Sequence, residues 1–131
     1  MKKRALVVDD DPDSRAIARE ALARAGFEVE EAADGIDALS SVERSRPDVV
    51  LLDLAMPRMD GWETARRMKK AGLEAGIVAV TAHALAGDRD KALAAGCDDY
   101  LAKAFQLPEL RATVARHLRS TAAVAGRLEP Y

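Results

Sequence analysis

Residues 49–53 read VVLLD, a run of four apolar side chains that ends at the carboxylate of Asp53. A strand with one solvent-facing side alternates apolar and polar residues, whereas a strand buried on both faces is apolar throughout. This run therefore predicts a central strand of a parallel sheet. Residues 77–81 read IVAVT and repeat the pattern, with Thr81 at the end. The sequence thus predicts two fully buried strands, each ending in a polar residue.

Strands and helices alternate on both sides of this pair. Shorter strands are predicted at residues 5–8, 27–31 and 100–102, and apolar residues at helical spacing follow each of the five strands. The dipeptide Asp11-Pro12 marks the start of the first helix and Gly26 its end, and an alanine-rich fourth helix is expected at about 85–95. Five β-α units predict an α/β fold with a doubly wound, five-stranded parallel sheet and right-handed crossovers.

The length and composition restrict the class of protein. The 131 residues fit one domain, which we place at residues 1–121, followed by a short tail at 122–131. The 20 basic and 22 acidic residues give a net charge of -2, which disfavours direct nucleic-acid binding. No apolar run approaches the roughly 20 residues needed to cross a bilayer, so no membrane insertion is expected. The single cysteine, Cys97, cannot form an internal disulfide, and this favours a cytoplasmic location.

Five polar residues follow the predicted strands and would meet at one edge of the sheet. They are Asp9 and Asp10 after the first strand, Asp53 after the third, Thr81 after the fourth and Lys103 after the fifth. Ligands of such sheets bind at this carboxyl edge. Three converging carboxylates call for a cation, and oxygen ligands without a nearby His or Cys favour Mg²⁺. With a hydroxyl and an ammonium group to hold an anion, the set suits phosphoryl transfer to an aspartate.

Each of these residues alone has a simpler explanation. An aspartate after an apolar run is usually a turn or capping residue, and a lone Thr or Lys there is more often a cap or a solvated charge. Their common position at one edge is what favours a functional site. Two other residues gain no role from this reasoning, because Cys97 is expected to be a small packing residue and His117 lies on the face of the last helix.

Four segments resemble the receiver domain of two-component response regulators. They read VVDDD at 7–11, LDLAMPRMDG at 52–61, VTA at 80–82 and YLAK at 100–103. The resemblance extends over about residues 3–119, and it implies the flavodoxin-like strand order 2-1-3-4-5. It also implies a signalling protein rather than an enzyme, one that at most catalyses its own phosphorylation and dephosphorylation.

The resemblance assigns roles to the acidic residues. Asp53 would accept a phosphoryl group from the phosphohistidine of a histidine kinase or a histidine phosphotransfer protein. The Mg²⁺ ligands would be Asp10, Asp53 and the backbone carbonyl of Ala55. Asp9 would act on the ion largely through water.

The resemblance also implies a switch. Thr81 and Lys103 would bind the phosphoryl oxygens, and the rotamer of Tyr100 would follow Thr81. This movement would change the protein-interaction face formed by the fourth helix, the fifth strand and the fifth helix. A downstream protein target would recognise that face.

The chain departs from the family after Lys103, where Ala104 replaces the usual proline and its cis peptide bond. A cis bond before a residue other than proline costs about 2.5–4 kcal/mol. A charge-assisted contact of Lys103 at the pocket would offset about 1.5–3 kcal/mol of that cost. We therefore expect a trans bond in the unphosphorylated protein and a different path for residues 103–107.

Two other functions are compatible with the sequence. A haloacid dehalogenase-like phosphatase would use Asp9 as the nucleophile and Asp11 as acid and base, but 131 residues is short for such an enzyme. That hypothesis also leaves Asp53 without a role. The second alternative is a receiver-like interaction module that is never phosphorylated. Ala104 is consistent with this module, whereas the complete set of acidic, Thr and Lys residues argues against it.

Overall fold

Five parallel strands form a single sheet in the computed structural model, which describes residues 3–54, 56, 60–81, 88–102 and 107–117. The strands are β1 (Arg4–Val8), β2 (Glu28–Ala32), β3 (Val49–Asp53), β4 (Gly76–Thr81) and β5 (Asp99–Ala102). Their order in the sheet is β2-β1-β3-β4-β5, and every neighbouring pair is parallel. The predicted fold class and strand order are confirmed.

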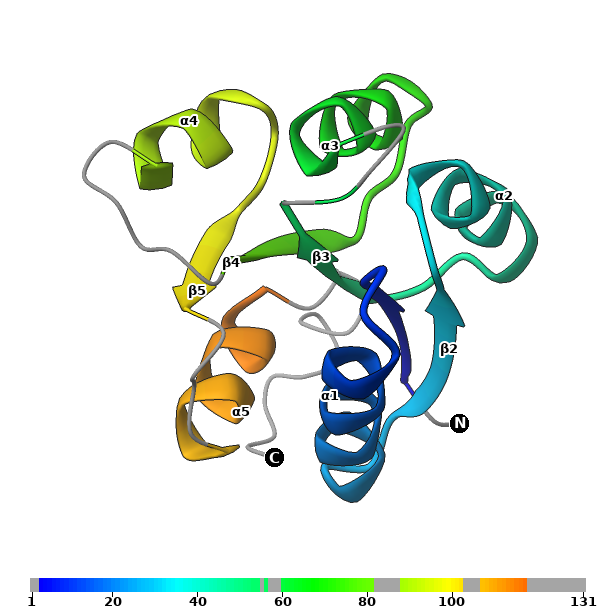
Figure 1. Ribbon diagram of the computed structural model, residues 1–131, viewed down its shortest axis with the longest axis vertical. Coiled ribbons are helices and arrows are strands. Elements are labelled where there is room, and N and C mark those ends of the chain that lie inside the picture. The colour runs from blue at the N-terminus through cyan, green and yellow to red at the C-terminus, as the bar shows by residue number, and fades with distance from the viewer. Residues whose placement is uncertain (1–2, 55, 57–59, 82–87, 103–106, 118–131) are drawn as a thin grey trace.

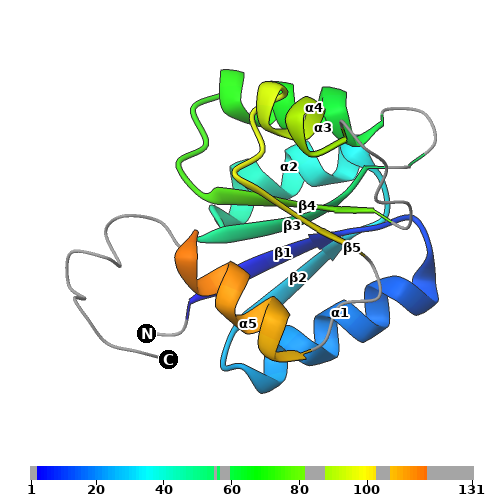
Figure 2. The same ribbon diagram turned by 90° about the vertical axis from the view of Figure 1, so that its left-hand side faces the viewer.

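A helix follows each strand, and the helices cover both faces of the sheet. They are α1 (Pro12–Arg24), α2 (Gly35–Ser45), α3 (Gly61–Lys70), α4 (Asp88–Ala94) and α5 (Leu107–Arg116). Helices α1 and α5 lie on one face and α2, α3 and α4 on the other (Figure 1). Figure 2 shows the sheet from its side, between these two layers. Within the described residues, no helix combines the length and the apolar composition of a membrane span.

Aspartates cap the N-termini of α1, α2 and α3. The side chains of Asp11, Asp34 and Asp60 accept hydrogen bonds from backbone N–H groups in the first turns of α1, α2 and α3. These bonds satisfy N–H groups that have no partner inside a helix. Since Asp11 and Asp34 lie within three residues of the ends of β1 and β2, the starts of α1 and α2 are fixed at the carboxyl edge of the sheet.

The strand β2 begins one residue later than the sequence predicted. The N–H of Phe27 donates to the carbonyl oxygen of Leu22 at 3.1 Å, and Gly26 before it has a φ of 100°. Phe27 therefore still belongs to the turn that ends α1. The first paired residue of β2 is Glu28, which lies opposite Arg4.

The central strands are buried on both faces, as their sequences predicted. In β3, Val50 and Leu52 belong to the apolar cluster beneath α2, α3 and α4. Val49 and Leu51 belong to the cluster beneath α1 and α5. All four side chains are at most 3% exposed. Packing on both faces holds β3 in place, so that the position of Asp53 at its end is well defined.

Candidate functional site

Three carboxylates lie together at the carboxyl edge of the sheet. One oxygen each from Asp9, Asp10 and Asp53 lies within 4.8 Å of the other two. Asp9 and Asp53 are 6% and 3% exposed, whereas Asp10 lies at the surface. The structure thus brings together the three acidic residues that the sequence predicted. A group of oxygen ligands of this kind fits a hard divalent cation such as Mg²⁺.

The strand register places Asp9 and Asp53 side by side. Val8 of β1 pairs with Leu52 of β3, so that the residues that follow them reach the edge together. The N–H of Asp9 donates to the carbonyl oxygen of Ala32, the last residue of β2, at 3.1 Å. The end of β1 is therefore fixed between its two neighbours in the sheet.

The third aspartate of the sequence motif, Asp11, has a different task. Its N–H donates to Oδ1 of Asp9 at 2.9 Å. Its own carboxylate accepts hydrogen bonds from the N–H of Asp13 and the hydroxyl of Ser14 at the start of α1. Because this carboxylate caps the helix, the geometry disfavours the acid–base role that the phosphatase hypothesis gives to Asp11.

Thr81 ends β4 at the same edge. Asp53 pairs with Val80, so that Thr81 lies one residue beyond it, and Thr81 pairs with Ala102 of β5. Thr81 is 7% exposed. Tyr100 is half-buried and packs against the apolar cluster beneath α2, α3 and α4. The hydroxyl residue and the aromatic residue of the predicted switch therefore lie on adjacent strands.

Three predictions fall on residues outside the described part of the chain. They concern the backbone carbonyl of Ala55, the ammonium group of Lys103 and the trans peptide bond between Lys103 and Ala104. All three stay predictions.

Gly61 brings the start of α3 against the end of β3. A Cβ atom at this position would lie 2.5 Å from Cα of Leu54 and 2.6 Å from the carbonyl oxygen of Asp53. The N–H of Gly61 donates to the carbonyl oxygen of Leu54 at 3.1 Å. Only a residue without a side chain allows this approach. The glycine of the sequence motif therefore holds the backbone next to Asp53.

A small pocket of about 70 Å³ lies beside the carboxylates, between the sheet and α1. Asp9 and Asp53 line it together with Ser14 and several apolar residues, among them the exposed Ile17. Pockets that bind organic substrates usually measure about 300–1,000 Å³. The site therefore suits an ion and a phosphoryl group presented by another molecule, rather than an enclosed organic substrate.

Sequence reasoning missed an arginine that contacts this site from α1. Nη1 of Arg15 donates to the carbonyl oxygen of Asp9 at 2.8 Å, and Nε donates to Oε1 of Glu31 at 3.0 Å. Nε of Arg19, one turn further along α1, lies 2.8 Å from Oε2 of the same glutamate. The available signal was the spacing of the two arginines by four residues, which places them on one face of the helix.

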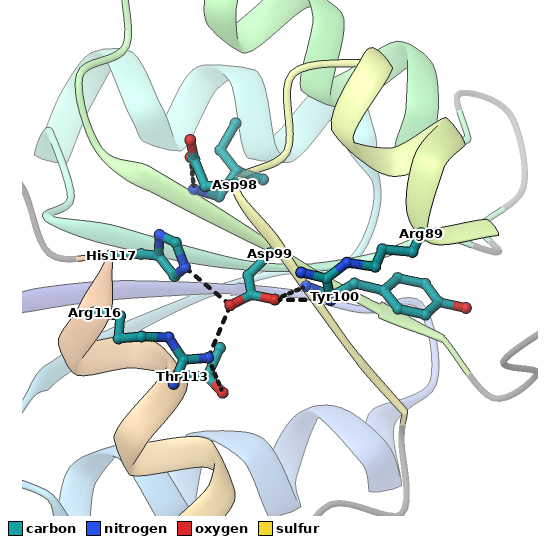
Figure 3. Close-up of polar contacts among 8 residues, drawn as sticks. Arg89, Asp98, Asp99, Tyr100, Thr113, Arg116 and His117 are labelled. Carbon is teal, nitrogen blue, oxygen red and sulfur yellow. Dashed lines mark hydrogen bonds and ion pairs between the residues drawn. The ribbon is translucent and has the colours of Figure 1, made fainter. Parts of the chain in front are cut away.

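A second polar cluster surrounds Asp99 at the start of β5 (Figure 3). Its Oδ2 lies 2.9 Å from both Nη2 of Arg116 and Nε2 of His117, and its Oδ1 accepts the N–H of Tyr100 and pairs with Arg89. Burial acts to raise the pKa of Asp99, but hydrogen bonds from Arg116, the Tyr100 N–H and His117 together hold it below the usual 3.8. The cluster ties α4 and α5 to β5. His117, which gained no role from the sequence, is one of its members.

Cys97 has the packing role that the sequence predicted. Its side chain is 4% exposed within the apolar cluster beneath α2, α3 and α4. Burial raises the pKa of its thiol to about 12. Since the thiolate is the reactive form, this cysteine is chemically inert at neutral pH.

The fold and the acidic edge define a receiver domain, and comparison with known proteins agrees. Residues 5–115 match the response regulator receiver domain, and the chain belongs to this family. The response regulator MprA of Mycobacterium sp. (strain KMS) is 42% identical over 130 residues, which cover 99% of this chain and 56% of that protein. MprA of Mycobacterium tuberculosis (strain ATCC 25177 / H37Ra) is 43% identical over 121 residues, 92% of this chain and 53% of that protein. The chain spans about half the length of the curated relatives it matches.

Solved receiver domains have the same fold. The receiver domain of the sensor histidine kinase PA1611 from Pseudomonas aeruginosa superimposes with a TM-score of 0.82 at 37% identity, over 89% of this chain and 98% of that one. Its structure has a magnesium ion coordinated in the active site cleft. The chemotaxis protein CheY4 of Vibrio cholerae gives a TM-score of 0.82 at 32% identity, over 90% of this chain and 100% of that one. The chain is a receiver domain of two-component response regulators.

Proposed function

We propose that this receiver domain takes a phosphoryl group onto Asp53 from the phosphohistidine of a histidine kinase or a histidine phosphotransfer protein. The position of Asp53 carries the proposal. Its carboxylate is buried, and one of its oxygens lies within 4.8 Å of oxygens of Asp9 and Asp10. Because β3 lies between β1 and β4, Asp53 has these two carboxylates on one side and Thr81 on the other.

The donor set fits Mg²⁺, which we take as the cofactor. The cluster consists of carboxylates, two of them buried and one exposed. Asp10, Asp53 and the backbone carbonyl of Ala55 would hold the ion, and Asp9 would act through water. When bound, Mg²⁺ would neutralise the negative charge that develops on the transferred phosphoryl oxygens. The magnesium ion in the related PA1611 receiver domain supports this assignment.

The reaction is a transfer of the phosphoryl group from nitrogen to oxygen. An oxygen of the Asp53 carboxylate attacks the phosphorus, and an O–P bond forms as the P–N bond breaks. The electron pair of the P–N bond stays on the imidazole nitrogen, and the ring takes up one proton from solvent and leaves as neutral histidine. The Thr81 hydroxyl and the Lys103 ammonium group donate hydrogen bonds to the phosphoryl oxygens of the product.

Phosphorylation would act on a partner through the face formed by α4, β5 and α5. A phosphoryl group adds about two negative charges, which draw Thr81 and Lys103 inward, and the side chain of Tyr100 follows. A downstream protein target recognises the changed face. We place the receiver at residues 1–121, with a tail at 122–131, and assign it to the cytoplasm. It would have no direct contact with nucleic acid and no catalysis beyond phosphorylation and dephosphorylation of its own aspartate.

Intact-mass spectrometry after incubation with acetyl phosphate tests the proposal. The wild-type chain should gain one phosphoryl group with Mg²⁺ and none in excess chelator, and Asp53→Ala should gain none. Asp13→Ala removes an exposed carboxylate from the first turn of α1 and should be labelled like the wild type. Label mapped to Asp9 would support the phosphatase hypothesis. A wild type that is never labelled would support the hypothesis of an unphosphorylated interaction module.

A further inference from the structure

The backbone of Asp9 is held on both sides. Its N–H donates to the carbonyl oxygen of Ala32 at 3.1 Å, and its carbonyl oxygen accepts Nη1–H of Arg15 at 2.8 Å. This carbonyl belongs to the peptide group that joins Asp9 to Asp10. The contact with Arg15 therefore sets the orientation of the peptide that carries two of the three carboxylates.

Arg15 is itself held in one orientation. Nε donates to Oε1 of Glu31 at 3.0 Å, so that the planar guanidinium binds acceptors on two different segments. Glu31 is fixed in turn by Arg19, whose Nε lies 2.8 Å from Oε2. The exposed fraction of the side chain is 21% for Arg15, 37% for Glu31 and 52% for Arg19. The contact with the site is made by the least exposed of the three, where solvent weakens a charge-assisted hydrogen bond least.

We propose that Arg15 is a positioning residue that orders the acidic pocket before a divalent cation binds. The inference rests on the proposed function, because Mg²⁺ is the ligand of that pocket. Arg15 acts through the Asp9–Asp10 peptide, whose orientation decides where the exposed carboxylate of Asp10 lies relative to Asp53. Groups that orient metal ligands in this way typically change metal affinity by about 10–100-fold.

Arg15 could affect Mg²⁺ binding through its charge as well as through positioning. The two effects change the affinity in opposite directions, so an experiment can separate them. A positive side chain near a cation site repels the cation, and its removal would by charge alone strengthen Mg²⁺ binding. Loss of positioning weakens binding, because the peptide must then be ordered when the ion arrives. Arg19 provides the matched control. It carries the same charge on the same helix and binds the same Glu31, whereas the carbonyl oxygen of Asp9 is bound by Arg15.

The experiment is a Mg²⁺ titration of isotope-labelled wild type and variants, followed by their amide NMR signals. The amide of Asp10 belongs to the peptide in question, so its chemical shift in the metal-free protein reports the orientation. Arg15→Met should move this signal and raise the Mg²⁺ dissociation constant about tenfold. Arg15→Lys keeps the charge with a shorter reach and should give an intermediate constant. Arg19→Met should leave both the Asp10 signal and the constant close to those of the wild type.

The outcomes separate the two proposals. If the wild type does not bind Mg²⁺, the proposed function is contradicted, and the role of Arg15 that depends on it is contradicted as well. If the wild type binds but Arg15→Met binds as tightly or more tightly, the positioning role is wrong. The same holds if Arg19→Met weakens binding as much as Arg15→Met. Thermal unfolding of the metal-free variants checks their folding, and if Arg15→Met does not fold, Arg15→Lys should still bind Mg²⁺ more weakly than Arg19→Lys.

Discussion

Asp10 differs from the other two carboxylates of the pocket because its side chain is exposed, whereas Asp9 and Asp53 are buried. The three nevertheless bring oxygens within 4.8 Å of one another. Two unit charges about 4 Å apart repel each other by roughly 1 kcal/mol in water, and by more where solvent is partly excluded. Without a cation, the repulsion between the three carboxylates therefore destabilises the folded protein. A bound cation relieves this repulsion.

Asp10→Asn should make the metal-free protein as stable as the wild type or more stable, by up to about 1 kcal/mol, because it removes one of the repelling charges. Mg²⁺ should stabilise the wild type by about 2.7 kcal/mol at a hundredfold excess over its dissociation constant, and Asp10→Asn should lose most of this gain. Thermal unfolding with and without Mg²⁺ measures both effects. Asp13→Asn, outside the pocket, should keep the full response to Mg²⁺. A metal-free Asp10→Asn that melts clearly below the wild type contradicts the repulsion argument.

At the level of elements, the apolar pattern was sufficient to predict the five strands and five helices, because each element buries its residues at the spacing its backbone requires. The contacts between elements could not be predicted in this way. Arg116 lies 17 residues from Asp99, and Arg15 lies 16 residues from Glu31. The spacing of residues along the chain predicts which side chains share a face of one element. It does not predict which residues of two different elements will contact each other. The meeting of Asp9, Asp10, Asp53 and Thr81 at one edge was predictable because the sheet topology brings the strand ends together there.

Asp99→Asn should lower the free energy of unfolding at neutral pH by about 1.5–3 kcal/mol, since it weakens charge-assisted bonds to Arg89, Arg116 and His117. The pKa of Asp99 lies below its usual value of 3.8. Its carboxylate form therefore stabilises the fold fully above that value, and the stabilisation is lost as the pH falls through the lower pKa of the folded protein. The difference between wild type and variant should thus shrink in urea unfolding below pH 3.8.

Glu63 provides the comparison for this pH dependence. Hydrogen bonds from Arg67 and Arg66 also lower the pKa of Glu63, but both ion pairs lie at the surface of α3. Exposed pairs contribute little to stability, so Glu63→Gln should have the smaller effect at every pH. A difference between wild type and Asp99→Asn that persists unchanged at low pH would show that the charge of Asp99 is not its source.

In the molecule as a whole, the acidic edge is connected to the face of α4, β5 and α5 by two neighbouring strands. Thr81 ends β4 next to Asp53 and pairs with Ala102 of β5. The other end of β5 begins at Asp99, which binds Arg89 of α4 and Arg116 of α5. A displacement of Thr81 toward a phosphoryl group therefore acts on a strand that is attached to both helices.

Helix α4 is short and buries few of its described side chains. It has seven residues, and among its described side chains Ala92 is buried while Leu93 is 40% exposed. Lys91 lies over the ring of Trp62 on α3, at 6.0 Å from its centroid, which is the outer limit of a cation–π contact. An element with few buried apolar contacts opens at a low free energy. A small shift between two states should therefore be visible there first.

Beryllofluoride, which imitates a phosphoryl group on an aspartate, should change the hydrogen exchange of the wild type most between residues 82 and 105. The change should be smaller in α1 and α2, because these helices follow β1 and β2 and are not attached to β5, the strand that pairs with Thr81. Asp53→Ala in the same solution should show no change. A largest change in α1 or α2 would place the output face elsewhere. Since Asp53→Ala leaves α4, β5 and α5 intact, the loss of the response in this variant would assign the change to the acidic edge and exclude direct binding of beryllofluoride at that face.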